Sequence, residues 1–486
     1  MEKQKSIKIN MLMSIILMVS NFVFPLITYA YVARVLLPEG TGKVAFVQSV
    51  LSYFMYIAAL GISGYGAREC AKVRDDKEKL SLLVQELLRV NFASTAVAYV
   101  ALMVALLLVP KFKEYAVLFV VMSSGILFQT LGIEWLYNAL EKYTYITIRS
   151  ISFKIVAVVL TFLLIKGPDD YVMYGAITIF ATLASNILNF INSRKYLSYK
   201  KFRVYDLKRH FKPIMIFFFS SIIMSIYGQF DSVMLGFMKN DGEVGIYNAA
   251  LKMKGIVVYV STAITSVLVP RMSMYFSKGM KEQFNELLVK SFRVTLILLF
   301  PLSLFVFFNA SDIIEFVCGT EFLSAIPTLR ILMICTLILS ITNLFGNQIL
   351  IPKGDEKRYS SSVFIGMFIN LGLNLMFIPK LASVGAAIAT LVTESFNAFW
   401  MGRGCKNEIS YIYRNIRKRP YIVSIIFAVL VEVLSIHINI SLPLFIRLVI
   451  NTICMFGSYY LMQFLQKEPI IYSFVSSWLR KLRIRN

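Results

Sequence analysis

Acidic side chains, histidines and cysteine motifs are scarce in this sequence. Of 486 residues, 27 are Asp or Glu against 50 Lys and Arg, and two are His. The five cysteines are scattered and form no CxxC pair, so neither a disulfide framework nor a metal site is indicated. HExxH, Walker A, GxSxG and Rossmann glycine patterns are missing as well. We therefore expect no metal, no cofactor and no catalytic residue, and we do not expect an enzyme.

Long hydrophilic segments are also missing from one side of the predicted membrane. The longest obvious connection there, around "NASDIIEFVCGTEFLSA", leaves no room for a soluble domain. An integral-membrane polysaccharide polymerase or ligase would place acids or a nucleophile in a sizeable outer loop. This class is therefore disfavoured, and a larger outer domain would revive it.

Apolar residues are abundant instead. They make up 58% of the chain, which includes 39 Phe and 26 Tyr, and a soluble core of this length needs far less apolar surface. A helix needs about 20 apolar residues to cross a bilayer. The sequence predicts an all-α polytopic membrane protein with about fourteen transmembrane helices, at 11–33, 44–65, 83–108, 115–137, 147–165, 171–192, 213–237, 244–269, 290–309, 322–345, 360–379, 382–402, 420–437 and 442–465.

Lys and Arg are concentrated in alternate connections, which predicts that these connections and both termini are cytoplasmic. The most basic connection is "SRKYLSYKKFRVYDLKRHFK", residues 193–212. The net charge of +23 is spread over short loops and is not gathered on one domain. We therefore attribute it to topology and to anionic lipid headgroups, and we expect no nucleic-acid binding.

A weak internal repeat relates two halves of the chain. "YGAITIFATLASNILNF" and "VGAAIATLVTESFNAFW" align without gaps, and Gly42 and Gly245 each open the second run of their half. Such duplication is typical of transporters, whose sites lie where the repeats meet; chance similarity among apolar helices is the alternative. The repeat predicts an N-terminal lobe at 1–192, a cytoplasmic basic linker at 193–212, a C-terminal lobe of six helices at 213–405, and two additional helices with a basic cytoplasmic tail at 406–486.

Charges inside the predicted helices are mostly cationic. Placing a charged side chain in hydrocarbon costs free energy, so such residues usually face a partner or a water-filled cavity. Unpaired Lys and Arg in a cavity would attract an anion, and phosphate suits them best. Snorkelling is the alternative for Arg34, Arg68 and Arg149, which lie near helix ends. The full set is Arg34, Arg68, Arg149, Lys154, Asp231, Lys252, Lys254, Arg330, Glu394, Glu432 and Arg447, of which Arg330, Glu394, Glu432 and Arg447 fit a structural role.

Lys252 and Lys254 fall on different faces of their helix. Helical spacing places Lys252 on one polar stripe. Asp231 in the preceding run lies at a similar depth, ~10 to 15 Å from the same membrane surface at ~1.5 Å per residue. We expect Lys254 to pair with Asp231, which leaves Lys252 for an anionic substrate. The stripe consists of Asn248, Lys252, Gly255, Tyr259, Thr262 and Ser266.

Four segments in order resemble the bacterial polysaccharide flippases, the Wzx-type exporters of O-antigen and capsule repeat units. The first, from Phe24 to Leu83, begins "FPLITYAYVARVLLPEGTGK", and it is followed by "EWLYNALEKYTYI", "DSVMLGFMKNDGEVGIYNAALKM" and "GAAIATLVTE". The resemblance implies the MATE-like fold of the multidrug/oligosaccharidyl-lipid/polysaccharide exporter superfamily, in which two six-helix lobes surround a cavity. It also implies a substrate, an undecaprenyl-diphosphate-linked oligosaccharide, moved from the cytoplasmic to the outer leaflet of the bacterial plasma membrane. A polysaccharide polymerase is an implied partner.

The residues that the resemblance carries over agree with the cationic set. Arg34 and Arg68 lie in its first segment, Glu134 in its second, and Asp231 and Lys252 in its third. We expect Arg34, Arg68, Arg149, Lys154 and Lys252 to bind substrate, and Glu134, Asn248, Tyr259, Asp231 and Lys254 to supply polar or ion-pairing groups.

Leu37 is a departure from the family pattern, because it replaces the usual glycine of "RVLGPEG". We therefore expect different packing at the end of the first run. Two related functions stay open. A multidrug or cation antiporter would favour acids in its cavity, whereas a flippase for a peptidoglycan lipid precursor would share the whole mechanism.

Overall fold

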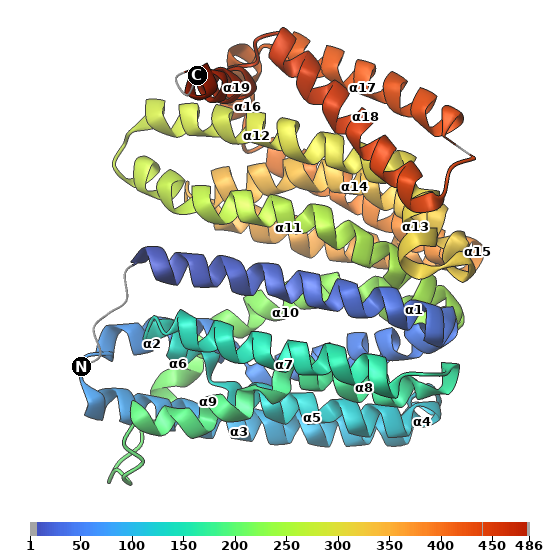
Figure 1. The fold of residues 1–486 in the computed structure, drawn as a ribbon. Helices are drawn as coiled ribbons and strands as arrows, with labels where there is room; N and C mark the ends of the chain where they lie inside the picture. Colours follow the sequence, from blue (N-terminus) through green and yellow to red (C-terminus); the bar gives the residue numbers. More distant parts are fainter. Residues whose placement is uncertain (1–6, 440, 484–486) are drawn as a thin grey trace. The chain divides into compact units, whose positions relative to one another are not determined.

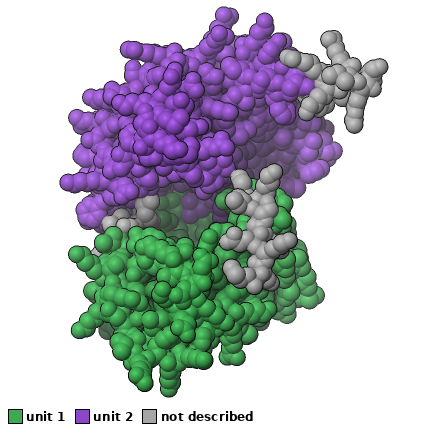
Figure 2. Space-filling model, turned by 90° about the vertical axis from the view of Figure 1, so that its left-hand side faces the viewer, with its two compact units in different colours: residues 1–248 green, residues 249–486 purple. Residues whose placement is uncertain are grey.

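The chain is almost entirely helical in the computed structural model, which describes residues 7–439 and 441–483 (Figure 1). Side chains at 7–8, 11, 219–227 and 478–483 are not described. The end of the predicted basic tail, 484–486, lies outside the described residues. By its contacts the chain divides into two compact units, residues 1–248 and 249–486 (Figure 2).

The predicted all-helical membrane fold is confirmed. Among the described residues, eleven helices are long and apolar enough to cross a membrane. Two of them each contain two predicted runs, because non-helical residues interrupt α1 at Leu37 and α15 at Ala382. The remaining predicted run, 213–237, lies in α10. Helices therefore account for all fourteen runs, and the protein is a multi-pass membrane protein.

The first unit contains ten helices and three short turns of 3₁₀ or π type within the described part of the chain. They are α1 (Ile7–Ala59), α2 (Ile62–Val73), α3 (Lys77–Leu108), α4 (Pro110–Glu114), α5 (Ala116–Gly132), α6 (Glu134–Ala139), α7 (Tyr143–Leu164), η1 (Pro168–Asp170), α8 (Tyr171–Ile179), η2 (Phe180–Ala184), α9 (Asn186–Asn192), η3 (Ser193–Lys195) and α10 (Lys208–Met238).

The second unit begins inside α11 (Asp241–Ser277) and continues to the end of the chain. In this unit α17 and α18 pack side by side (Figure 1). Its other elements are α12 (Lys281–Phe308), α13 (Ala310–Cys318), η4 (Thr320–Ala325), α14 (Ile326–Asn343), η5 (Leu344–Leu350), α15 (Glu356–Gly402), α16 (Lys406–Asn415), α17 (Lys418–Ile438), α18 (Leu444–Leu465) and α19 (Pro469–Arg483).

The surface of α3 shows how these helices meet lipid. Val97, Val100, Met103 and Leu107 recur at helical spacing and are each 61–65% exposed. The opposite face is buried against its own unit, with Val84 and Leu87 fully inaccessible. An exposed apolar stripe of this length would be a liability in water, whereas in a bilayer it faces hydrocarbon chains.

The break in α1 occurs at Leu37, where the sequence departs from the family pattern. Leu37 has φ 58° and ψ 179°. Only glycine adopts this region without steric strain, because a Cβ clashes with the backbone there. Pro38 follows directly and cannot donate an amide hydrogen bond to continue the helix. Leucine therefore occupies a backbone conformation that favours glycine, and the expected difference in packing stays a prediction.

A close backbone contact connects the second half of α1 to the start of α11 within the first unit. A Cβ added to Gly42 would lie 1.8 Å from the Asp241 carbonyl oxygen, and one added to Gly245 would lie 2.0 Å from the Pro38 oxygen. Only glycine permits such an approach. The contact is reciprocal, as expected for elements related by the sequence repeat. The lobe boundaries drawn from that repeat, 1–192 and 213–405, stay a prediction, because α10 packs against α1 in the first unit.

The basic linker, 193–212, is bound to α3. The buried carboxylate of Glu86 accepts hydrogen bonds from the Asp206 amide at 2.8 Å, from His210 Nε2 at 2.9 Å and from Arg209 Nη2. His210 Nδ1 in turn lies 2.8 Å from the Tyr65 hydroxyl. Three donors on one carboxylate keep it ionised in the interior. The linker therefore fixes the start of α10 against α2 and α3.

Asp76 determines where α3 begins. Its carboxylate accepts hydrogen bonds from the backbone N–H groups of Lys79 and Glu78 at 3.1 Å each, as an N-cap residue does. The Lys79 ammonium lies 3.0 Å from the same carboxylate. The backbone bond from Lys79 and the Lys79 side chain together lower the pKa of Asp76.

The strain at Leu37 predicts a stabilising substitution. Leu37→Gly should raise the free energy of unfolding by about 1 kcal/mol, because the strain of 1–3 kcal/mol that it removes exceeds the entropy that glycine adds to the unfolded chain. The measurement is the thermal unfolding midpoint of the purified protein in detergent. Val35→Gly, at a helical position of α1, is the matched control and should lower the midpoint. A lower midpoint for Leu37→Gly as well would contradict the strain.

Candidate functional site

Arg34 and Arg68 are the exposed cations of the first unit's candidate set. Arg34 on α1 is exposed, and its Nη1 donates to the Ala30 carbonyl at 2.6 Å. The Arg68 side chain on α2 is 54% exposed and lies 3.0 Å from the neighbouring Glu69 carboxylate. The Arg68 guanidinium also lies 5.3 Å from the centre of the Phe217 ring. Both guanidinium groups are therefore held near helix surfaces, where an anion can reach them.

The predicted polar stripe on α11 is continuous and open. The helix is unbroken from Asp241 to Ser277. Asn248 and Lys252 are half-buried, and the Tyr259 side chain is 42% exposed. A Cβ built on Gly255 would meet nothing within 4 Å. Hydroxyl, amide and ammonium groups thus follow one another along a surface-facing strip of α11.

Asp231 has a partner that the sequence analysis missed. The Tyr247 hydroxyl donates to Asp231 Oδ2 at 2.6 Å, and both residues belong to the first unit. Lys252 and Lys254 belong to the second unit, and both are half-buried. The pairing of Asp231 with Lys254 therefore stays a prediction. Tyrosine sixteen positions after an acid is no recognisable motif, and only the packing of α10 on α11 creates this contact.

Arg149 lies inside the first unit. Its side chain is 3% exposed, which rules out snorkelling to the headgroups. Nη2 lies 2.9 Å from the half-exposed Glu134 carboxylate, and Nη1 donates to the Ser185 carbonyl at 3.2 Å. The guanidinium therefore joins α7 to the start of α6 and to the π turn η2. Both Arg149 and Glu134 were predicted as substrate or cavity residues, and the structure brings these two together.

Lys154 is also buried, one helical turn and a half further along α7. It is 4% exposed, and its Nζ donates to Ser20 Oγ at 3.1 Å and to Asn21 Oδ1. Ser20 and Asn21 interrupt the apolar first run of the sequence, and this interruption was the signal that could have identified them. Lys154 thus binds α7 to α1. Its predicted role in substrate binding stays a prediction.

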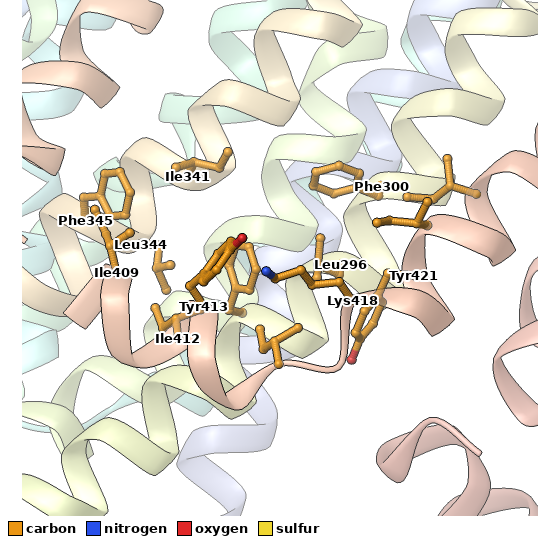
Figure 3. A pocket seen from close by; sticks show the side chains of 14 residues that line it. Leu296, Phe300, Ile341, Leu344, Phe345, Ile409, Ile412, Tyr413, Lys418 and Tyr421 are labelled. Carbon is orange, nitrogen blue, oxygen red and sulfur yellow. The ribbon is translucent and has the colours of Figure 1, made fainter. Parts of the chain in front are cut away.

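The second unit contains a separate apolar pocket of about 460 Å³ (Figure 3). Phe300 and Leu296 of α12, Phe345 of η5 and Ile412 of α16 are among its walls. Lys418 is the single charged residue in the lining, and its ammonium lies 2.9 Å from the centre of the Tyr413 ring. Such a mostly apolar lining suits a hydrocarbon chain.

The described side chains contain no group of three or more His, Cys, Asp or Glu that could hold a metal ion. The site is built from cations, hydroxyls and amides. These groups can bind and orient an anion.

Comparison with known families identifies the chain. A family model described as "Polysaccharide biosynthesis protein" matches residues 7–276, more than half of the sequence. The chain belongs to this family. A second model, described as "MatE", matches residues 217–376. The two matches agree with the family and superfamily that the sequence resembles.

Three curated relatives are described as transporters or flippases. The "Putative O-antigen transporter" of Escherichia coli (strain K12) is 23% identical over 80% of this chain and 94% of its own length. The protein of the same description from Shigella dysenteriae is 25% identical over 82% of this chain and its full length. The "Probable low-salt glycan biosynthesis flippase Agl15" of Haloferax volcanii is 26% identical over 43% of this chain and 41% of its own.

The fold also matches a solved structure, "Lipid II flippase MurJ, inward closed conformation". The TM-score is 0.71 at 16% sequence identity, covering 95% of this chain and all of the other. This likeness confirms the fold that the resemblance implied.

The contrast between Arg149 and Arg68 predicts different effects on stability. Arg149→Gln should lower the free energy of unfolding by about 2 kcal/mol, because it removes charge-assisted hydrogen bonds that are buried. Arg68→Gln should change it by less than about 1 kcal/mol, since its ion pair is exposed. Thermal unfolding of the two purified variants measures the difference. Equal losses of unfolding free energy in the two variants would contradict the prediction that the buried arginine contributes more to stability.

Proposed function

We propose that this protein is a flippase for lipid-linked oligosaccharides. It moves undecaprenyl-diphosphate-linked repeat units from the cytoplasmic to the outer leaflet by alternating access, for the synthesis of a surface polysaccharide. The family assignment and the full-length similarity to O-antigen transporters support this function.

The chemical problem for such a substrate is the loss of water. A diphosphate and several sugar hydroxyls must leave their hydration shells to cross hydrocarbon, and each group without a new partner costs several kcal/mol. The lipid tail needs no help, because it stays in the bilayer. A flippase therefore has to supply cations for the diphosphate and hydroxyl or amide groups for the proximal sugars.

The main support for this proposal is that two arginines of the candidate set are exposed, whereas two glutamates inside the predicted helices are buried. Arg34 and Arg68 are exposed, and Lys252 lies on the open polar stripe of α11. The acids Glu394 and Glu432 are 5% and 0% exposed. Exposed cations suit a diphosphate, and the half-exposed acid of the candidate set, Glu134, is paired with Arg149. A drug or cation antiporter requires the reverse, so this alternative is disfavoured.

Each group in the proposed cavity has a role. Arg34, Arg68 and Lys252 replace water around the diphosphate, since guanidinium and ammonium groups donate several hydrogen bonds to phosphate oxygens. Asn248 and Tyr259 contact the sugars that follow. A change in the accessible side then moves the polar headgroup across while these contacts persist. No covalent bond changes in this cycle, so the protein is a transporter and not an enzyme.

The proposed location is the cytoplasmic membrane of a bacterium, with both termini in the cytoplasm. The concentration of Lys and Arg in alternate connections supports this orientation. A polysaccharide polymerase that consumes the translocated repeat unit on the outer side is the partner expected in such a pathway.

Neutralising the three cations tests the function. The triple variant Arg34→Gln, Arg68→Gln, Lys252→Gln should reduce surface glycan at least about tenfold in cells lacking other copies of the gene, because a tenfold loss corresponds to only 1.4 kcal/mol of lost binding. Quantitative immunoblotting of surface polysaccharide is the readout, with the amount of variant in the membrane measured in parallel.

A second triple variant controls for the loss of charge. Lys200→Gln, Lys201→Gln and Arg203→Gln remove three positive charges from the exposed linker and should leave export intact. Lys254→Gln, two residues from Lys252, should retain most activity in the same assay. Full export by the first triple variant at normal membrane levels would refute the proposed site.

A further inference from the structure

A buried carboxyl lies where α17 and α18 pack against the end of α12. Glu432 on α17 is 0% exposed. Its Oε1 accepts a hydrogen bond from Nδ2 of Asn309, the residue that follows α12. Its Oε2 is equally buried and has no hydrogen-bond partner among the described residues. Half of this carboxyl group is therefore satisfied and half is not.

A directed chain of hydrogen bonds ends at Glu432 Oε1. Asn439 Nδ2 donates to Ser435 Oγ at 3.0 Å, and the Ser435 hydroxyl donates to Asn451 Oδ1 at 2.7 Å. Asn451 Nδ2 then donates to Asn309 Oδ1 at 2.7 Å. Every donor in the chain points toward the carboxyl. The chain defines Oε1 as the acceptor oxygen and leaves Oε2 as the oxygen free to carry a proton.

Arg447, Arg330 and His437, on the helices around Glu432, make their contacts with groups other than the Glu432 carboxyl. Arg447 of α18 forms a two-pronged ion pair with Asp312 of α13, at 2.5 and 2.6 Å. Arg330 of α14 donates to the Phe307 carbonyl at 3.3 Å. His437 of α17 is exposed and lies 2.7 Å from the Val433 carbonyl. In the part of the chain that the structure describes, Glu432 has no ion pair.

An ionised carboxylate in this position would be costly. Burial removes its water, and one amide hydrogen bond on one oxygen does not replace it. Glu86 shows the opposite case in the same chain, because three donors, one of them an arginine, surround its two buried oxygens. A neutral acid at Glu432 leaves only a hydroxyl without a partner, which costs far less than a charge.

We propose that Glu432 is a proton-binding site. The folded protein holds it as a carboxylic acid with the proton on Oε2. Release of the proton leaves a carboxylate. The proton passes to water beside Asn439, which follows the end of α17 about 10 Å along the helix axis from Glu432. The charge left behind weakens the packing of α17 and α18 on α12. Because Tyr421 and Ile422 of the same helix line the apolar pocket, proton release at one end changes the pocket at the other.

The pH dependence of stability is the first test. A folded state that keeps a proton which the unfolded chain has released loses stability as the pH rises. The melting temperature of the purified wild type should therefore fall from about pH 5 to about pH 9 relative to Glu432→Gln, a neutral isostere that keeps the acceptor oxygen. Glu86→Gln is the matched control and should melt below the wild type throughout this range, because its carboxylate is ionised and paired.

Infrared spectroscopy provides a second test that needs no substrate. The carbonyl stretch of a protonated carboxyl at neutral pH should be present in the wild type and absent from Glu432→Gln. Parallel pH profiles for the two proteins, or a band unchanged by the substitution, would overturn the proposal. A sodium-dependent shift in melting that Glu432→Gln removes would also overturn it, in favour of a cation site. None of these outcomes depends on glycan transport, so the flippase proposal is tested separately.

Discussion

A charge inside a membrane protein needs either a partner or access to water, and this constraint organises the whole structure. Hydrocarbon supplies no hydrogen bonds, so each buried ionic group must find its contacts within the protein. Glu86 finds three donors, Arg149 finds Glu134 and the Ser185 carbonyl, and Lys154 finds Ser20 and Asn21. Arg34 and Arg68 remain at helix surfaces. These exposed guanidinium groups are among those that we propose bind the substrate.

A second constraint is steric and concerns the backbone near Leu37. The helix breaks there, and the chain then approaches the start of α11 so closely that Gly42 and Gly245 admit no side chain. The contact joins positions that the predicted sequence repeat would make equivalent. The Leu37 side chain is 37% exposed.

Much of the fold could be predicted from sequence because hydrophobic length is a local property. Helices account for all fourteen apolar runs, whereas the missing family glycine at Leu37 predicted altered packing and not a break in the backbone. The partners of Arg149, Lys154 and Glu86 could not be predicted in the same way. Glu86 and the linker residue His210 are separated by more than a hundred positions, and only the packing of α2, α3 and α10 brings them together.

The candidate site was predictable in type but not in detail. The charged residues inside the predicted helices are mostly Lys and Arg, which indicated an anionic substrate. The resemblance to Wzx-type flippases then implied that the anion is a diphosphate. The sequence could not distinguish a buried, structural cation from an exposed one, because both lie in apolar runs. Helical phase placed Lys252 on the polar stripe of α11, and the structure describes that stripe as open. Glu432 was assigned a structural role, and nothing in the sequence indicated that one of its oxygens is buried without a hydrogen-bond partner among the described residues.

The central claim is that the protein replaces the water around a diphosphate. The most direct measurement is the rate of transbilayer movement in liposomes containing the purified protein, using one oligosaccharide on two polyprenyl carriers. One carrier is joined through a diphosphate and the other through an uncharged linkage. We expect the diphosphate-linked glycan to move at least about tenfold faster, a difference of 1.4 kcal/mol. Equal rates for the two carriers would contradict it.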